Sequence, residues 1–289
     1  MLFRGNAPAL VTPFTDDNTI DEAAFKQLID DQIAGGVGAL VALGTTGENP
    51  TISHKERQFI VDLAIDHTAG RVPVIIGTGT NNTQESVQFS KEAAAAGAHG
   101  LLVVGPYYNK PTQAGLIAHV SEIAEATDCP IIFYNVPGRT ASNILPETML
   151  AMAARIPTVL GVKEASGDIA QITDILANRP AHLAVYSGDD EMTLPLLLMG
   201  GDGVISVLSN ARPALMTQLA VAGLDGKFDE ARALHFKLVD AMRACFYESN
   251  PVPIKTVLAH EGKMKAHVRL PLLPLSPGNL EDVLDAFRI

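Results

Sequence analysis

Lys163 stands at the end of a short run of apolar and β-branched residues, 159–163, and a turn rich in Ser, Gly and Asp follows it. Such a run is typical of a buried strand. An ammonium group is costly to bury unless it is paired or loses its proton. A free lysine, with a pKa of about 10.4, is a poor nucleophile near neutral pH. Burial would lower that pKa, and the neutral amine could then form a Schiff base with a carbonyl compound. The alternative is a lysine that reaches solvent or pairs with Glu164.

Other polar side chains follow other predicted strands. The segment 44–48 (Gly-Thr-Thr-Gly-Glu) offers paired hydroxyls and free backbone N–H groups that could bind a carboxylate, although such a turn often only begins a helix. Tyr134 ends one strand and Arg139 lies in the next loop, so they could supply a general acid/base and a carboxylate clamp. Alternatively, Tyr134 caps the core and Arg139 is a solvated loop charge. Tyr107 and Tyr108 form an aromatic pair suited to an interface, to ligand stacking or to simple loop packing.

Metal chemistry and phosphate binding fit the sequence less well. No His-x-x-x-His or Cys/His pattern occurs, and carboxylates do not cluster at several strand ends, so we expect no metal site. Cys129 and Cys245 lack metal-ligand spacing and are expected to pack as small apolar residues. The segment 200–203 (Gly-Gly-Asp-Gly) resembles a phosphate-binding loop, but it precedes a strand and would lie at the opposite end of the fold. A lysine, hydroxyls, a phenol and an arginine remain, and this set suits imine chemistry.

Short apolar runs alternate with helical patterns along most of the chain. The eight predicted strands are 7–11, 38–42, 74–77, 100–104, 131–134, 159–163, 183–187 and 203–207. Two capping boxes, Ser53 with Glu56 and Asn82 with Glu85, mark predicted helix starts. Eight successive βα units predict an α/β fold of the (β/α)8 TIM-barrel type, whose catalytic residues gather at the C-terminal strand ends. A doubly wound sheet is the alternative, but no Gly-rich dinucleotide motif follows any strand.

The strand pattern stops near residue 224. Three helices are predicted beyond it, at 228–247, 253–261 and 279–289, with a Pro-rich connection at 270–277. We therefore predict a catalytic barrel domain over 1–223 and a C-terminal helical region over 224–289 that packs on it.

The overall charge argues against two classes of partner. The chain has 21 basic and 32 acidic residues, a formal net charge of −11, and no basic cluster, so neither nucleic acid nor an anionic membrane is an expected partner. The first residues do not have the pattern of a signal peptide, and no apolar stretch is long enough to span a bilayer. We expect a soluble cytoplasmic protein.

Five segments, in order along the chain, resemble the class I pyruvate-dependent aldolase/lyase family, which includes dihydrodipicolinate synthases and N-acetylneuraminate lyases. The matching segments are 44–48 (Gly-Thr-Thr-Gly-Glu), 107–109 (Tyr-Tyr-Asn), 134–137 (Tyr-Asn-Val-Pro), 161–165 (Gly-Val-Lys-Glu-Ala) and 203–206 (Gly-Val-Ile-Ser). The resemblance implies a (β/α)8 barrel, a pyruvate imine on Lys163 without a further cofactor, and a homotetramer built as a dimer of dimers. The chain is more similar to the synthases, because Arg139 stands where the lyases typically have an apolar residue.

The resemblance also implies the roles of individual residues. The implied catalytic residues are Lys163, Tyr134, Thr45 and Tyr108, the last supplied by a neighbouring subunit. The implied substrate-binding residues are Thr45, Thr46, Arg139 and Ile205. The implied reaction joins pyruvate and L-aspartate 4-semialdehyde into 4-hydroxy-tetrahydrodipicolinate, the committed step of diaminopimelate and L-lysine biosynthesis. A lyase acting on N-acetylneuraminate or a keto-deoxy sugar acid is the alternative, and a non-catalytic ligand sensor is a weaker one.

Many synthases bind L-lysine as a feedback inhibitor at a dimer interface. The positions here that agree with such a site are Asn49, His54, Asn81, Glu85 and Tyr107. Pro50 and Arg57 depart from the inhibited pattern, which has alanine and histidine there. Arg57 would put a cation beside a cationic effector and weaken its binding, so the sequence leaves L-lysine inhibition open.

Overall fold

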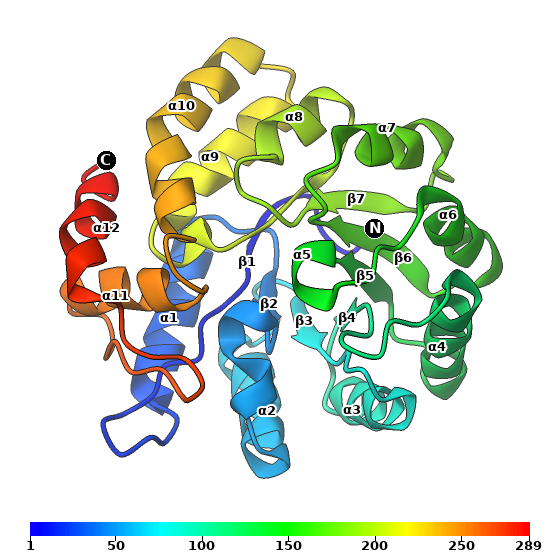
Figure 1. Cartoon of the computed structure of the whole chain (residues 1–289), viewed down its shortest axis with the longest axis horizontal. Helices are drawn as coiled ribbons and strands as arrows, with labels where there is room; N and C mark the ends of the chain where they lie inside the picture. Colours follow the sequence, from blue (N-terminus) through cyan, green and yellow to red (C-terminus); the bar gives the residue numbers. More distant parts are fainter.

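Eight short parallel strands form the centre of the molecule, and helices surround them (Figure 1). The computed structural model describes all residues, 1–289. The strands are β1 (Gly5–Pro8), β2 (Leu40–Ala42), β3 (Val74–Gly77), β4 (Gly100–Val104), β5 (Ile131–Asn135), β6 (Val159–Glu164), β7 (Ala184–Ser187) and β8 (Gly203–Ser206). Consecutive strands pair from β2 to β8, β8 also pairs with β1, and a single bridge between Ala9, just after β1, and Val41 of β2 completes the ring. The barrel is thereby closed, which confirms the predicted fold.

The predicted bounds of the first strand are wrong. Residues 7–11 were expected to form it, whereas β1 covers Gly5–Pro8. Ala9 still donates its N–H to Ser206 of β8, but the backbone then leaves that ladder: Leu10 donates its N–H to Val41, and Val11 donates its N–H to the side chain of Asn210. The run beyond Pro8 is buried and apolar, so its composition does not distinguish it from a regular strand. The other strands lie within two residues of their predicted ends.

Helices connect the strands and cover the outside of the barrel. They are α1 (Glu22–Ala34), α2 (His54–Thr68), α3 (Thr83–Ala95), α4 (Gln113–Ala126), α5 (Pro137–Thr140), α6 (Pro146–Arg155), α7 (Ile169–Asn178), α8 (Thr193–Leu198) and α9 (Pro213–Leu224). Short 3₁₀ turns follow two strands: η1 (Thr45–Gly47) and η2 (Asn49–Thr51) after β2, and η3 (Leu208–Asn210) after β8. The C-terminal strand ends therefore carry short turns and loops, as a barrel active site requires.

Of the two predicted capping boxes, only one forms. At α2, Ser53 and Glu56 exchange both hydrogen bonds of the box. At α3, the Asn82 side chain accepts from the N–H groups of Gln84 and Glu85, but Glu85 returns no bond. The Asn82 N–H is instead satisfied by the hydroxyl of Thr80, at 3.0 Å. A competing local acceptor thus leaves the Glu85 side chain free.

Polar and aromatic contacts close the end of the barrel at which the strands begin. The rings of Phe3 and Tyr186 stack with centroids 4.2 Å apart, and the Tyr186 hydroxyl donates to the Phe3 carbonyl. Asp202, just before β8, pairs with Arg179 and accepts the N–H of Val185 at 2.8 Å. The 200–203 segment therefore lies at this end, as predicted, and its acidic residue serves the fold.

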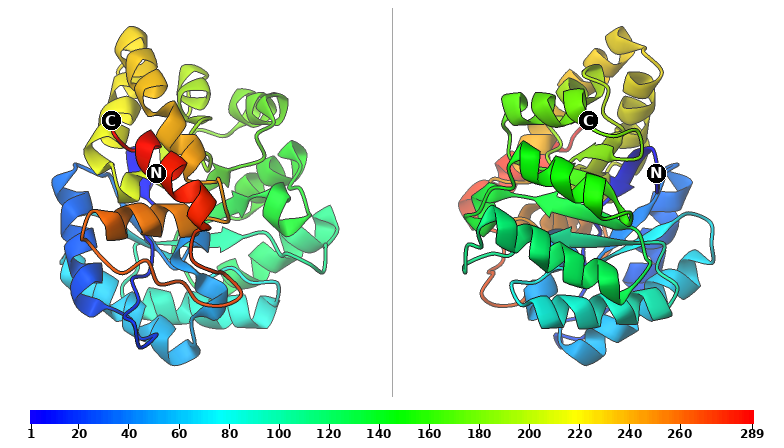
Figure 2. Two further views of the ribbon diagram at one scale, coloured as in Figure 1. Left: turned by 60° about the vertical axis from the view of Figure 1, so that its left-hand side comes forward. Right: turned by 90° about the vertical axis from the view of Figure 1, so that its right-hand side faces the viewer.

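The C-terminal residues form helices α10 (Phe228–Ala244), α11 (Val252–His260) and α12 (Leu280–Ala286), with a 3₁₀ turn η4 (Pro277–Asn279). All three predicted helices exist: α10 and α12 are shorter than predicted, and α11 has the predicted length but begins one residue earlier. Figure 2 shows α11 and α12 beside α10 on one flank of the barrel. The division into domains at residues 223 and 224 stays a prediction. None of the helices is both long and apolar enough to cross a membrane.

Candidate active site

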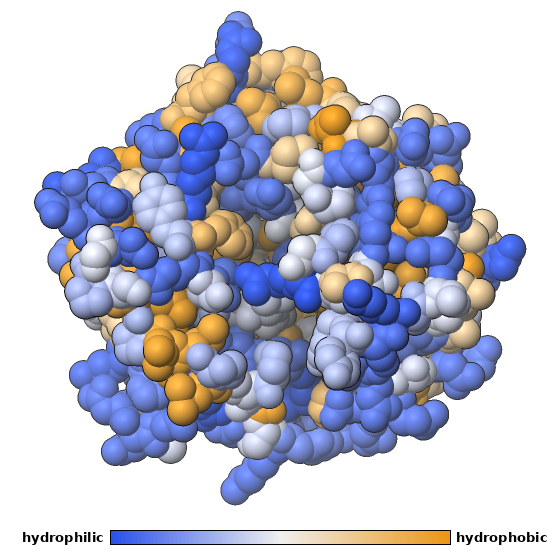
Figure 3. Space-filling model, viewed as in Figure 1, coloured by the Kyte–Doolittle hydropathy of each residue, from blue (hydrophilic) through white to orange (hydrophobic).

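A cavity of about 440 Å³ opens at the C-terminal ends of the strands. The surface in the view of Figure 1 is hollowed near its centre, among hydrophilic side chains (Figure 3). The predicted residues that line the cavity are Thr45, Thr46, Tyr134, Arg139 and Lys163. Residues that lie more than a hundred positions apart in the sequence are therefore gathered at one mouth, because parallel strands end at the same side of a barrel.

Lys163 lies on β6 and is only 4% exposed. Its amine lies 4.2 Å from the centroid of the Tyr134 ring, which the strand register places directly beside it. Burial lowers the pKa of Lys163 to about 7, the Asp190 carboxylate opposes this shift, and the Arg139 cation adds to it. The amine makes no ion pair, so it loses its proton far more readily than a solvated lysine.

Glu164 does not pair with Lys163, so that alternative is wrong. Successive strand residues point to opposite faces, and the buried Glu164 carboxylate faces the helices. It accepts hydrogen bonds from Asn135, Gln171 and the N–H of Ser166. The Glu164 charge is thereby satisfied on the outer face of β6, and the Lys163 amine stays free on the inner face.

Two further residues, Gly188 and Asp190, lie beside Lys163 in the loop after β7. Gly188 borders the lysine so closely that an added Cβ would lie 2.9 Å from Lys163 Cε. Asp190 is 2% exposed, and its Oδ2 accepts the N–H groups of Val207 and Leu208, while its Oδ1 has no partner. Burial raises the pKa of Asp190 to about 6. The signal in the sequence was their position after the seventh strand.

The turn η1 lies across the cavity from β6. Its N–H groups at Gly47 and Glu48 bond back to Gly44 and Thr45, so the first N–H groups of the turn, at Thr45 and Thr46, have no partner within it. Those two groups are free to accept an anion as a partner, and the role predicted for the 44–48 segment stays a prediction.

Tyr134 and Arg139 complete the wall of the cavity. Burial raises the pKa of Tyr134, while the Arg139 cation and the neighbouring Thr45 side chain partly oppose that shift. Arg139 lies on α5, is exposed and makes no ion pair. A cation without a partner at the mouth suits a substrate carboxylate.

Two predicted residues do not line this cavity. Tyr108 is 89% exposed and adopts the left-handed backbone conformation, with φ of 72°. Ile205 is a buried residue of β8 inside the barrel. The role of Tyr108 in a neighbouring subunit stays a prediction, as does that of the Ile205 carbonyl.

A smaller cavity of about 180 Å³ lies on the far side of Thr45 and Tyr134. Among the residues predicted for an L-lysine site, Asn49 and Tyr107 line it. His54 instead lies 3.1 Å from Glu92, and the Asn81 carbonyl accepts the side-chain amide of Asn109. The five predicted positions are therefore only partly gathered in the single chain.

Arg57 is buried beside this smaller cavity and contacts two of the residues that line it. Its guanidinium donates to the Gly77 carbonyl at 2.8 Å and to the Asn49 side chain, and it stacks 4.0 Å from the centroid of the Phe89 ring. Burial lowers the pKa of Arg57 to about 10, so it remains charged at neutral pH.

No group of three or more His, Cys, Asp or Glu side chains is placed to hold a metal ion. Cys129 and Cys245 are both free and buried, as predicted.

The comparisons with known proteins agree with this geometry. The model of the dihydrodipicolinate synthetase family matches residues 2–288. The 4-hydroxy-tetrahydrodipicolinate synthase of Salinibacter ruber is 65% identical, over 99% of this chain and 96% of that protein. The crystal structure of dihydrodipicolinate synthase from Thermotoga maritima has a TM-score of 0.97 and 43% identity, over 99% of this chain and 98% of that one.

A further solved structure is the chloride-inhibited dihydrodipicolinate synthase of Acinetobacter baumannii in complex with pyruvate. It has a TM-score of 0.96 and 37% identity, over 99% of this chain and 98% of that one. With a family model that matches nearly every residue and relatives that share its full length, this chain belongs to the dihydrodipicolinate synthetase family.

Proposed function

We propose that this chain condenses pyruvate with L-aspartate 4-semialdehyde to give 4-hydroxy-tetrahydrodipicolinate, the committed step of diaminopimelate and L-lysine biosynthesis. The observation that carries the proposal is the unpaired amine of Lys163, buried at the mouth of the barrel with its pKa lowered to about 7. The match to synthases over the full chain supports the same reaction.

The first half of the reaction forms a nucleophile from pyruvate. The neutral amine of Lys163 adds to the keto carbon, and loss of one water gives an imine. Once protonated, the imine nitrogen draws electrons from the adjacent methyl group, which loses a proton and becomes an enamine. The N–H groups of Thr45 and Thr46 hold the pyruvate carboxylate across the cavity, which fixes the keto carbon near Lys163. No metal or organic cofactor takes part in this scheme.

The second half joins the two substrates. The enamine carbon attacks the aldehyde, and Tyr134 with Thr45 moves the proton that the new alkoxide takes up. Arg139 binds the carboxylate of the semialdehyde through charge-assisted hydrogen bonds. The amino group of the substrate then displaces Lys163 from the imine, closes the ring and regenerates the free amine. The Ile205 carbonyl helps to orient that amine.

The experiment that tests this function is reductive trapping. The protein is incubated with pyruvate and borohydride, and we expect the reduced adduct on the peptide that contains Lys163. An adduct found elsewhere, or none, would contradict the imine mechanism. Rates with L-aspartate 4-semialdehyde and with N-acetylmannosamine then compare the two acceptors, and a preference for the sugar would replace the synthase by the lyase.

The finer assembly is also a proposal. We infer a cytoplasmic homotetramer, a dimer of dimers, in which Tyr108 reaches a neighbouring active site and extends the Tyr134–Thr45 relay. The 89% exposure of Tyr108 supports this, because its side chain is available to another copy. Tyr108→Phe should slow turnover without changing the sedimentation coefficient. An unchanged rate would remove this residue from the relay.

We infer that L-lysine binds weakly to this chain. Arg57 already engages Asn49 and keeps its positive charge close to the side chains that would hold the effector. Two cations in one small site repel each other. Calorimetric titration should show weak binding that strengthens in Arg57→His, and tight binding by the unaltered protein would contradict this inference.

A further inference from the structure

A second lysine is buried behind the pyruvate-binding turn. Lys255 of α11 is fully buried, and its ammonium donates to Glu48 Oε1 at 2.7 Å and to the Thr12 carbonyl at 2.9 Å. The same ammonium lies 4.4 Å from the centroid of the Phe14 ring. Glu48 is almost equally buried, with its side chain 1% exposed. Each charge of this pair is therefore removed from water and satisfied by the protein.

Glu48 is the residue that ends η1. Its backbone is left-handed, with φ of 55° and ψ of 35°, and its N–H bonds to the Thr45 carbonyl. Only one residue separates it from Thr46, whose N–H we assign to the pyruvate carboxylate. A left-handed non-glycine residue needs tertiary contacts to hold its backbone conformation. The contacts of the Glu48 side chain therefore help to fix the end of η1.

The C-terminal segment holds the same turn at other points. The N–H of Arg269 donates to Glu48 Oε2 at 2.9 Å, so both oxygens of that carboxylate are used. The Asn250 amide donates to the Thr46 hydroxyl at 2.9 Å. From the other side, the Thr12 hydroxyl donates to the Gly47 carbonyl at 2.8 Å. The turn is therefore held by chain segments from both ends of the sequence.

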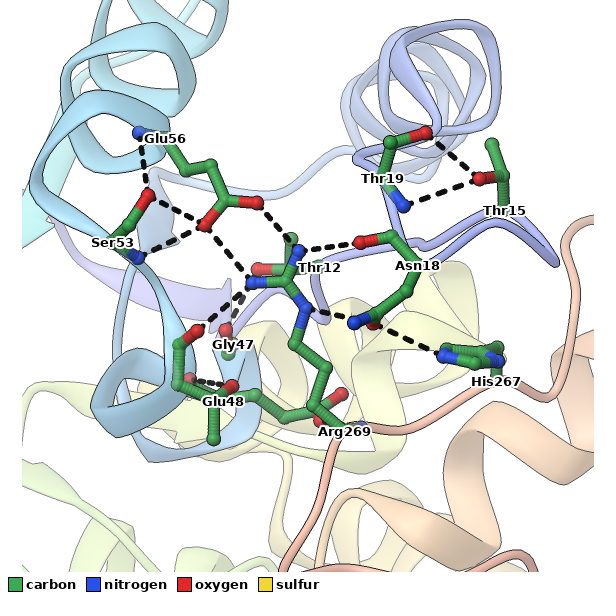
Figure 4. Close-up of polar contacts among 11 residues, drawn as sticks. Thr12, Thr15, Asn18, Thr19, Gly47, Glu48, Ser53, Glu56, His267 and Arg269 are labelled. Carbon is green, nitrogen blue, oxygen red and sulfur yellow. Dashed lines mark hydrogen bonds and ion pairs between the residues drawn. The ribbon is translucent and has the colours of Figure 1, made fainter.

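Arg269 is itself locked in place. Figure 4 shows its guanidinium between Glu56 and Asn18. It donates to both Glu56 oxygens, at 3.0 and 2.5 Å, and it lies 4.2 Å from the Phe14 ring centroid. The hydrogen bond from Arg269 lowers the pKa of Glu56 to about 2. Glu56 lies in the first turn of α2, so the start of that helix and the C-terminal segment hold the turn between them.

We propose that Lys255 and Glu48 are positioning residues for the pyruvate site, which act by fixing the Thr45–Thr46 turn rather than by touching substrate. Neither residue lines the active-site cavity. Their pair holds the free N–H groups of the turn in line with Lys163 across the mouth. The C-terminal helical region thereby takes part in substrate binding without entering the site. This proposal rests on the proposed function, since it assigns the carboxylate of pyruvate to that turn.

The direction of the effect follows from the cost of a buried unpaired charge. Removing one partner leaves the other charge without compensation, and the structure then relaxes to let water in. The relaxation would move the turn, while Lys163 and Arg139 keep their own strand and helix. We therefore expect the loss to fall on pyruvate and to spare the aldehyde.

The test measures the pyruvate concentration that gives half-maximal borohydride trapping at Lys163 in the full-length protein. Lys255→Met and Glu48→Gln should each raise that concentration about tenfold or more, which corresponds to about 1.4 kcal/mol of lost binding. The steady-state KM for pyruvate should rise in parallel, while the KM for L-aspartate 4-semialdehyde changes less than about twofold. A merely structural pair would reduce the folded fraction and leave both KM values unchanged.

The matched control is Arg179→Met, which breaks the Arg179–Asp202 ion pair at the opposite end of the barrel. It should lower the melting temperature without moving the pyruvate dependence. If Lys255→Met does not fold, Glu48→Gln decides, because its amide oxygen can still accept the Arg269 N–H. Folded variants with an unchanged pyruvate dependence would overturn the proposal. Absence of an adduct in the unaltered protein would instead overturn the proposed function.

Discussion

Lys163 and Lys255 are two lysines buried in the same molecule with opposite surroundings. Lys163 is 4% exposed and faces an open cavity without an ion pair, whereas Lys255 is fully enclosed and bonded to Glu48 and Thr12. Burial lowers the pKa of both amines. At Lys255 the adjacent Glu48 carboxylate opposes that shift directly, while at Lys163 the opposing carboxylate of Asp190 makes no contact with the amine.

The comparison shows that burial alone does not make a reactive lysine. A buried ammonium is retained where a carboxylate compensates it, and a neutral amine results where none does. The two lysines also differ in accessibility. Lys163 lines a cavity that a substrate could enter, whereas Lys255 is enclosed on all sides. The following four predictions change the partner or the charge on one side of the comparison.

The largest effect is expected from removing the reactive amine. Lys163→Met should yield no borohydride-trapped adduct and lower turnover by on the order of 10⁴-fold or more. The Lys255→Met variant should still form the adduct at saturating pyruvate, because it retains Lys163 and the Lys255 amine is not the nucleophile. Mass spectrometry of the digested protein distinguishes the two, and an adduct retained in Lys163→Met would show that the wrong lysine was chosen.

The free energy of unfolding should change more in Lys255→Met than in Lys163→Met, the opposite of the order expected for turnover. Lys255→Met leaves Glu48 buried and unpaired, so we expect a loss of about 3–5 kcal/mol in the free energy of unfolding. Lys163→Met replaces an uncompensated amine with an apolar side chain and should leave that free energy unchanged or raise it. Urea unfolding of both variants, monitored by circular dichroism, measures the difference. Equal losses would mean that the two burials are energetically alike.

Removing the cation at the mouth should affect the aldehyde more than pyruvate. Arg139→Leu deletes a charge-assisted contact worth about 1.5–3 kcal/mol, so kcat/KM for L-aspartate 4-semialdehyde should fall by about 10- to 150-fold. Trapping with pyruvate should persist. Because the Arg139 cation helps to lower the pKa of Lys163, the midpoint of trapping should also move to higher pH. A fall confined to pyruvate would contradict the assignment.

The smallest change concerns pH. Imine formation needs the neutral amine, whose pKa is lowered to about 7, so the trapping rate at fixed pyruvate should rise about tenfold per pH unit below 7 and level off above it. The Asp190 carboxylate favours the charged form of Lys163, so Asp190→Asn should move the midpoint of the trapping profile to lower pH. Stopped borohydride reactions between pH 5 and 9 measure both profiles, and a midpoint near that of free lysine would refute the role of burial.

Much of the fold could be predicted from the sequence, for physical reasons. Each strand is a short apolar run bounded by turn residues, and the barrel order follows from eight such runs. Lys163 could be found because it interrupts this pattern at a strand end. The bounds of β1 could not be predicted, since Leu10 and Val11 remain apolar while their N–H groups bond to Val41 and Asn210.

The residues that hold the site in place were harder to predict than the residues that line its cavity. Glu48 was visible only as the end of a turn, and its partner Lys255 lies 207 residues further along the chain. Asp190 likewise acts through space on Lys163; its position after the seventh strand places it at the same end of the barrel but does not identify Lys163 as its neighbour. The side chains proposed to react lie at strand ends, where the sequence pattern identifies them, whereas the side chains proposed to position them come together only on folding.

The contacts of Glu48 also have a consequence for the order in which the enzyme is made. Its last hydrogen-bond donor, the N–H of Arg269, is 221 residues further along the chain. A ribosome that has completed all eight strands and Lys163 has therefore not yet supplied the groups that hold the turn after β2. The nascent chain would carry its proposed nucleophile before the donors at Asn250, Lys255 and Arg269 are made. The synthesis of this C-terminal segment is therefore expected to complete the proposed substrate site.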